Sequence, residues 1–102
     1  MLVTVQAATA STLPSSEISG VTVTVKVEEP NFNPAKVVIR RGDTVRWVNT
    51  DTIDHTTTSD TGLWDETLSP GESFTFKFRK AGVFGYHCEI FPDMLGTIIV
   101  KR

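Results

Sequence analysis

Apolar and polar residues alternate in short runs along most of this chain, and glycine, proline, asparagine and aspartate separate the runs. A period of two predicts β-strands that bury one face. The first run shows the pattern most clearly, because four valines at every second position from Val21 to Val27 alternate with polar residues. We expect strands at residues 21–27, 37–39, 45–49, 55–58, 74–78, 83–88 and 96–101. No stretch makes a convincing helix.

Seven or eight short strands without a helix predict an all-β fold, in which two antiparallel sheets pack face to face as a Greek-key β-sandwich. Residues 59–72 contain two glycines and a proline and are expected to form a long connection. Trp64, within that connection, is expected to cover the edge of the core, with a place in a docking surface as the alternative. Trp47, Phe74, Phe76 and Phe78 are expected to be core residues.

The length of 102 residues indicates one domain. Residues 1–20 are rich in serine, threonine and alanine and are expected to form a flexible arm or an added edge strand, whereas residues 21–102 form the domain proper. No apolar run has the length needed to span a membrane.

Charged residues make up 22% of the chain, and the net charge is -2, with acidic and basic residues interleaved along the sequence. This pattern excludes a basic footprint for nucleic acid, so no nucleic-acid partner is expected. The two adjacent basic pairs, Arg40-Arg41 and Lys101-Arg102, are expected to be solvated strand ends.

Three residues carry the candidate chemistry: Cys88, Met94 six positions later, and His55 far upstream. Cys88 ends a predicted strand on its core-facing side, and Pro92 and Gly96 favour a compact loop that lets Met94 fold back toward the thiol. A thiolate and a thioether that converge at one point suit copper, and imidazole completes such a set. Each residue alone has an ordinary structural explanation, but together they predict a metal site.

The sequence resembles the single-domain cupredoxins of the amicyanin, plastocyanin and pseudoazurin group over residues 21–101. The resemblance rests on residues 32–51, on His55, on the Leu68-Ser69-Pro70-Gly71 turn, and on the segment from Tyr86-His87-Cys88 to Met94. It implies a type 1 (blue) copper site with Cys88 as the strong equatorial thiolate, His55 as the N-terminal imidazole ligand and Met94 as the weak axial ligand. Thr56 would support the cysteine loop from the second coordination shell.

The resemblance also implies one-electron transfer with small redox proteins as partners. These partners would dock on an apolar surface made by Ile90, Phe91, Pro92 and Leu95. A monomer in the periplasm or another extracytoplasmic compartment is expected, with residues 1–20 as a link to a membrane anchor. No enzyme is expected, because the chain has neither a nucleophile elbow nor a glycine-rich phosphate loop.

Phe91 departs from the family pattern, because it stands where the second histidine ligand is expected. With three donors left, we expect weakened copper binding that is biased toward Cu(I), and a raised redox potential. Two alternatives remain open: a Cu(I)-binding or copper-delivery module, and a metal-free domain used for protein binding in which Phe91 fills the space. Glu89 or Asp93 is a further candidate to replace the missing ligand. His87 is expected on the opposite strand face and not as a ligand.

Overall fold

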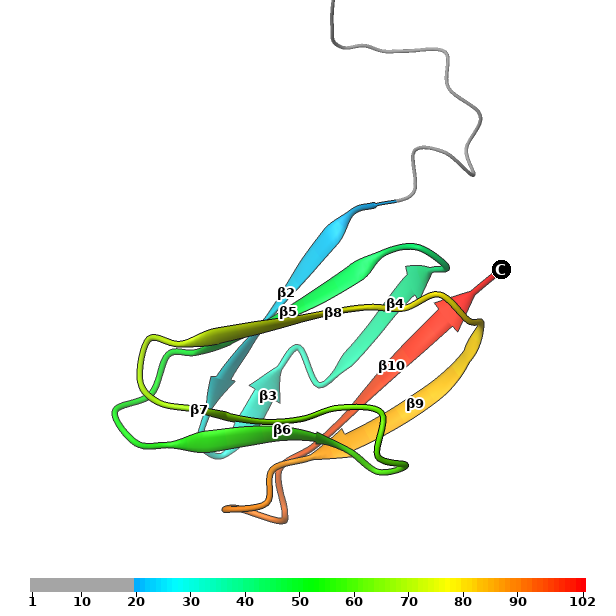
Figure 1. Cartoon of the computed structure of the whole chain (residues 1–102). Coiled ribbons are helices and arrows are strands. Elements are labelled where there is room, and N and C mark those ends of the chain that lie inside the picture. The colour runs from blue at the N-terminus through cyan, green and yellow to red at the C-terminus, as the bar shows by residue number, and fades with distance from the viewer. Residues whose placement is uncertain (1–19) are drawn as a thin grey trace, which may run out of the picture.

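The structure, a computed structural model, describes residues 20–102, which form two β-sheets packed face to face (Figure 1). The predicted arm lies outside these residues except for Gly20. Within the described range there are nine strands and no helix, and so no helix that could span a membrane. The strands are β2 (Thr22–Glu28), β3 (Asn31–Asn33), β4 (Lys36–Arg40), β5 (Thr44–Asn49), β6 (His55–Ser59), β7 (Asp65–Leu68), β8 (Ser73–Lys77), β9 (Gly82–His87) and β10 (Leu95–Lys101).

The larger sheet has the strand order β4-β10-β9-β6-β7, and the smaller sheet has the order β3-β2-β5-β8. The predicted sandwich is confirmed, but its sheets are mixed and not purely antiparallel. β10 pairs with β4 in parallel, and β2 pairs with β5 in parallel. Parallel pairs arise because the chain leaves one sheet and returns to it after passing through the other.

All seven expected runs coincide with strands to within one residue at each end, but β3 and β7 were not predicted. β3 has three residues and lies between Pro30 and Pro34, which are turn signals in the sequence. β7 lies inside the expected long connection, where only Leu68 of its four residues is buried. Both strands are at sheet edges, where a strand pairs with a single neighbouring strand and the alternation of apolar residues is weak.

The core fills the space between the sheets, and aromatic rings occupy its centre. The ring centroid of Trp47 lies 5.2 Å from that of Trp64 and 5.3 Å from that of Tyr86. Trp64 is buried, as predicted, and its indole N–H donates to Thr57 Oγ1 at 3.0 Å. Phe78 is also buried, whereas Phe74 and Phe76 are only partly buried, because their strand β8 is at an edge of the smaller sheet.

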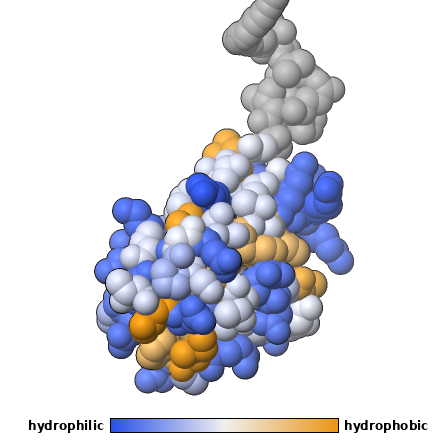
Figure 2. All heavy atoms as spheres, turned by 60° about the vertical axis from the view of Figure 1, so that its left-hand side comes forward, coloured by the Kyte–Doolittle hydropathy of each residue, from blue (hydrophilic) through white to orange (hydrophobic). Residues whose placement is uncertain are grey.

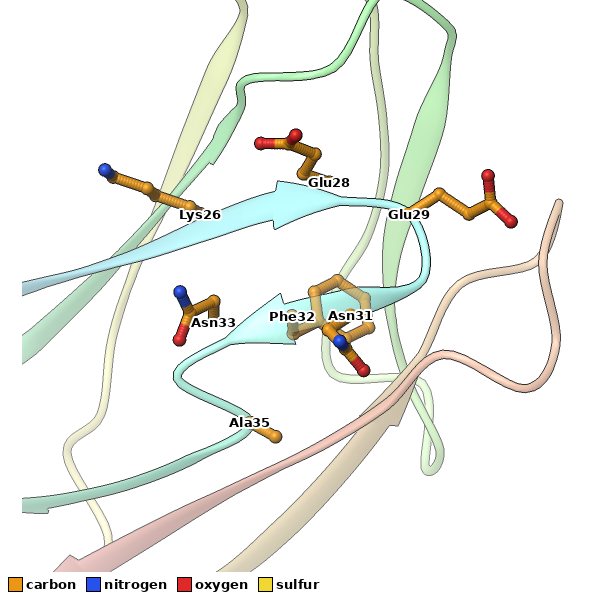
Figure 3. A pocket seen from close by; sticks show the side chains of 7 residues that line it. All are labelled: Lys26, Glu28, Glu29, Asn31, Phe32, Asn33 and Ala35. Atoms are coloured by element: carbon orange, nitrogen blue, oxygen red, sulfur yellow. The ribbon is translucent and has the colours of Figure 1, made fainter.

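A surface hollow of about 530 Å³ lies on the hairpin of β2 and β3 (Figure 3). It is lined by Lys26, Glu28, Glu29, Asn31, Phe32, Asn33 and Ala35. None of these is a candidate copper ligand, so the hollow is separate from the predicted site.

Asp43 ties together three segments at the end of the sandwich where β4 and β10 finish. Its carboxylate accepts the backbone N–H groups of Gly20 at 3.0 Å, Val21 at 3.2 Å and Arg40 at 3.0 Å. The bond from Arg40 does most to hold the pKa of Asp43 below its usual 3.8; burial opposes this, and the bonds from Gly20 and Val21 add to it. The ionised form is therefore the one that the fold stabilises.

Replacing Asp43→Asn should destabilise the protein at neutral pH by about 1–3 kcal/mol, because three partly buried backbone donors lose a charged acceptor. The pKa of Asp43 is lower in the folded than in the unfolded state. Its contribution is therefore complete above the unfolded value of about 4 and is lost as the pH falls through the folded value. Urea unfolding at pH 7 and pH 3 should show a smaller difference between the two proteins at pH 3.

The exposed Asp54→Asn provides the control for removing one carboxylate, and it should change the stability little at either pH. A difference between Asp43→Asn and the unsubstituted chain that is the same at both pH values would contradict the role of the ionised carboxylate.

Candidate metal centre

The ends of three strands bring His55, Cys88 and Met94 to one end of the sandwich. His55 is the first residue of β6, Cys88 follows the last residue of β9, and Met94 precedes β10. All three are buried, with exposed fractions of 0%, 0% and 2%. His55 Nδ1 lies 3.8 Å from Cys88 Sγ. Metal–nitrogen and metal–sulfur bonds of about 2.0–2.3 Å allow one ion to bond to both atoms across such a gap.

The segment from Cys88 to Met94 is a loop closed at its neck by backbone hydrogen bonds. The N–H of Cys88 donates to the carbonyl of Met94 at 3.1 Å, and the N–H of Met94 donates to the carbonyl of Phe91 at 2.9 Å. These bonds keep the two sulfur-bearing residues adjacent although five residues separate them in sequence. Among residues 20–102 no three side chains of the types His, Cys, Asp and Glu form a metal-binding cluster. The candidate set therefore depends on the thioether of Met94 as its third donor.

Thr56 binds the segment after β9 twice, through its backbone to Cys88 and through its hydroxyl to Glu89. Its N–H donates to Cys88 Sγ at 3.3 Å, and its Oγ1 accepts the N–H of Glu89 at 2.7 Å. Burial raises the pKa of the Cys88 thiol, but the N–H of Thr56, the ring of His55 and the N–H groups of Phe91 and Ile90 together lower it. The thiolate, which is the form that binds metals, is therefore more accessible here than in an ordinary cysteine.

Asp51 determines which nitrogen of His55 faces the sulfur. Its Oδ2 lies 2.9 Å from His55 Nε2, on the side of the ring away from Cys88. Nε2 therefore carries the proton, and the lone pair of Nδ1 points toward the sulfur. Burial lowers the pKa of His55, but its hydrogen bonds with Asp51 and Cys88 outweigh burial and raise it.

Asp51 is itself held in place by its loop. It accepts the N–H groups of Thr52 at 2.7 Å and Glu29 at 3.0 Å, and its own N–H donates to Asn49 Oδ1 at 2.8 Å. The hydrogen bond from His55 does most to lower the pKa of Asp51, and the two backbone bonds add to it. No role for Asp51 was predicted from the sequence. An acidic residue four positions before the candidate histidine was the signal available.

Phe91 lies beside the imidazole of His55, with ring centroids 5.1 Å apart and an interplanar angle of 43°. It is partly buried and packs against the core. The ring offers no donor to a metal, but it covers the site with apolar surface. An apolar cover lowers the local dielectric constant and disfavours the more highly charged state of a bound ion.

His87 lies on the other side of β9, as expected for a residue adjacent to Cys88 in a strand. Its Nδ1 lies 2.6 Å from Asp60 Oδ1, and its Nε2 lies 2.7 Å from Glu89 Oε2. Asp60, followed by Glu89, raises the pKa of His87. The carboxylate of Glu89 is thus directed to the outer surface, while Asp93 is exposed on the loop.

Apolar side chains are exposed around the loop that covers the site. Ile90 and Leu95 have exposed fractions of 47% and 64%, Pro92 is exposed, and Phe91 is partly buried. Figure 2 shows apolar atoms gathered at the lower end of one face, with hydrophilic atoms around them.

Comparison with known proteins gives one consistent family. The sequence model of the cupredoxin-like domain matches residues 1–100. A plastocyanin of Scenedesmus fuscus is 39% identical over 84 residues, which cover 69% of this chain and 86% of that protein. The amicyanin of Paracoccus denitrificans is 24% identical over 93 residues, covering 85% of this chain and 71% of that protein. The crystal structure of the amicyanin from Paracoccus versutus superposes with a TM-score of 0.70 at 26% identity, covering 84% of this chain and 87% of that one. The chain belongs to the cupredoxin family.

Proposed function

We propose that this protein is a type 1 copper protein that transfers single electrons through a site altered at one ligand. The observation that carries the proposal is the 3.8 Å approach of His55 Nδ1 to Cys88 Sγ, both buried, with the buried Met94 joined to Cys88 by a backbone hydrogen bond. Bound copper would supply the one-electron chemistry by cycling between Cu(I) and Cu(II). Cys88 would be its equatorial thiolate, His55 its imidazole ligand and Met94 its weak axial ligand.

The protein's part is to hold these donors in place before the metal arrives. Thr56 donates to the sulfur, Asp51 orients the imidazole, and Phe91 keeps water away. Donors that are fixed by their own hydrogen bonds move little when the charge of the metal changes. A small rearrangement of this kind suits an electron carrier better than an enzyme that must bind and turn over a substrate, so we assign no catalytic activity.

Phe91 leaves two strong donors and one weak donor, a set that Cu(I) tolerates better than Cu(II). We therefore infer weakened copper binding, a bias toward Cu(I) and a raised redox potential. The same soft donors support a second candidate function, a module that binds or delivers Cu(I) without transferring electrons. Reversible electrochemistry of the copper form would favour the carrier, and tight Cu(I) binding without it would favour the delivery module.

We further propose that small redox proteins dock on the surface of Ile90, Phe91, Pro92 and Leu95, which covers the site. Exposed apolar patches commonly mark interaction sites. The protein would act as a monomer in the periplasm or another extracytoplasmic compartment. Its similarity to plastocyanin and amicyanin supports this choice of compartment.

Replacing Phe91→His should restore a fourth donor. Titration with Cu(II) should then give an intense blue thiolate charge-transfer band and tighten Cu(II) binding by more than the ~10–100-fold that outer ligand partners contribute. The redox potential should fall, and electron self-exchange should become faster because an imidazole replaces the phenyl ring at the surface.

Cys88→Ser in both backgrounds is the matched control and should abolish the band, because the band arises from the thiolate. An equally intense and stable band in the unsubstituted chain would contradict the altered site. Failure of both proteins to take up copper would instead support a metal-free domain used for protein binding. Glu89→Ala and Asp93→Ala should leave the affinity unchanged, since Glu89 is engaged by His87; a loss in either would reveal a substitute carboxylate ligand.

Replacing Asp51→Asn should raise the redox potential by tens of millivolts, because a negative charge that favours Cu(II) is removed from the far side of the imidazole. Protein-film voltammetry on the Phe91→His background would measure the shift. Asp54→Asn, an exposed carboxylate on the same loop, is the control and should shift the potential less. Equal shifts in the two variants would mean that the hydrogen bond that His55 donates to Asp51 has no special effect on the potential.

A further inference from the structure

Charged side chains that are interleaved in sequence are separated in space along the strands. β2, β5 and β9 run from one end of the sandwich to the other, while β4, β8 and β10 run the opposite way, as the pairing registers show (Figure 1). Residues 40–44, 77–82 and 101–102 therefore meet at one end. Direct bonds join them: the N–H of Arg41 donates to the carbonyl of Lys101 at 2.9 Å, and the N–H of Gly42 donates to that of Phe78 at 2.7 Å.

This end, which we call the basic pole, carries seven cationic side chains, all of them exposed. They are Arg40, Arg41, Lys77, Arg79, Lys80, Lys101 and Arg102. The same three segments contain one acidic side chain, Asp43, which is turned inward with 7% of its surface exposed and accepts three backbone N–H groups. The side chains of the pole thus sum to +6, from seven cations and one carboxylate.

The opposite end, which holds the candidate copper site, has the reverse charge. Residues 28–35, 49–55, 69–72 and 88–94 contain seven carboxylates and neither lysine nor arginine. These carboxylates are Glu28, Glu29, Asp51, Asp54, Glu72, Glu89 and Asp93. A molecule with a small net charge therefore has two strongly and oppositely charged ends.

Two further features distinguish the basic pole. The chain enters the described domain there, since Gly20 and Val21 donate to Asp43. Val21 and Val83, at the starts of β2 and β9, are 59% and 72% exposed close to the cations. Cations and exposed apolar side chains on one surface are the combination that favours the interface of an anionic bilayer.

We propose that the basic pole rests on a membrane surface rich in acidic phospholipid headgroups. In this orientation the copper end, whose carboxylates such a surface repels, faces away from the bilayer toward soluble partners. The seven cations come from three separate segments at one end of the sandwich, and none of them lines the hollow on the β2–β3 hairpin. Charge spread over three segments suits a continuous, laterally mobile anionic surface better than the shaped face of one acidic protein.

Sedimentation of the full, metal-free chain with vesicles tests the proposal independently of the copper site. Binding to vesicles of phosphatidylcholine mixed with phosphatidylglycerol should exceed binding to phosphatidylcholine alone and should weaken as salt is added. The triple variant Arg79→Gln, Lys80→Gln, Lys101→Gln should lower the partition coefficient by about a hundredfold, at roughly fivefold for each cation near the surface.

The triple variant Lys26→Gln, Lys36→Gln, Arg46→Gln is the matched control, because it removes the same charge from exposed positions along the strands and outside the pole. It should retain most of the binding, and circular dichroism should show that both variants are folded. Equal losses in the two variants would overturn the proposal, since net charge and not the pole would govern binding. Absence of binding to the mixed vesicles at low salt would also overturn it, in favour of an acidic protein partner.

Discussion

The hydrogen bonds between Thr56 and the segment after β9 are the constraint on which the candidate site depends. Regular pairing of β6 with β9 covers only Thr58 with His87 and Ser59 with Tyr86. Beyond that point the N–H of Thr56 binds the sulfur of Cys88, and its hydroxyl oxygen accepts from Glu89. A buried sulfur anion without donors would be costly. These bonds lower that cost and fix the distance from the sulfur to His55 without any help from a metal.

Two neighbours of His55 act on the site in opposite directions. Asp51 places a negative charge behind the imidazole and thereby favours the oxidised state of a bound ion. Phe91 places an apolar ring beside it, removes one donor and favours the reduced state. The opposing effects of Asp51 and Phe91 would together set the redox potential of a bound copper ion. Both residues lie at the end of the molecule that carries seven carboxylates. The basic pole is far from both residues because the strands separate it from the copper end.

The pattern of short apolar and polar runs predicted seven of the nine strands in the described range. Trp64, expected to cover the edge of the core from a connecting segment, is buried. β3 and β7 were missed because an edge strand needs one partner and little apolar surface, so its sequence resembles a loop. In the site, the spacing of Cys88 and Met94 indicated the metal chemistry. Asp51 was missed because a hydrogen bond between a loop carboxylate and a histidine leaves no periodic signal.

The sequence by itself determined that the chain folds as a β-sandwich and which donors it can offer to copper, because strand periodicity and donor chemistry are properties of local sequence. The tertiary structure alone decided the orientation of the imidazole and the separation of charge into two poles. The chain reverses direction from strand to strand, and turns that are far apart in sequence therefore meet at one end. Charges that alternate along the sequence are consequently sorted by strand direction, which no local pattern records.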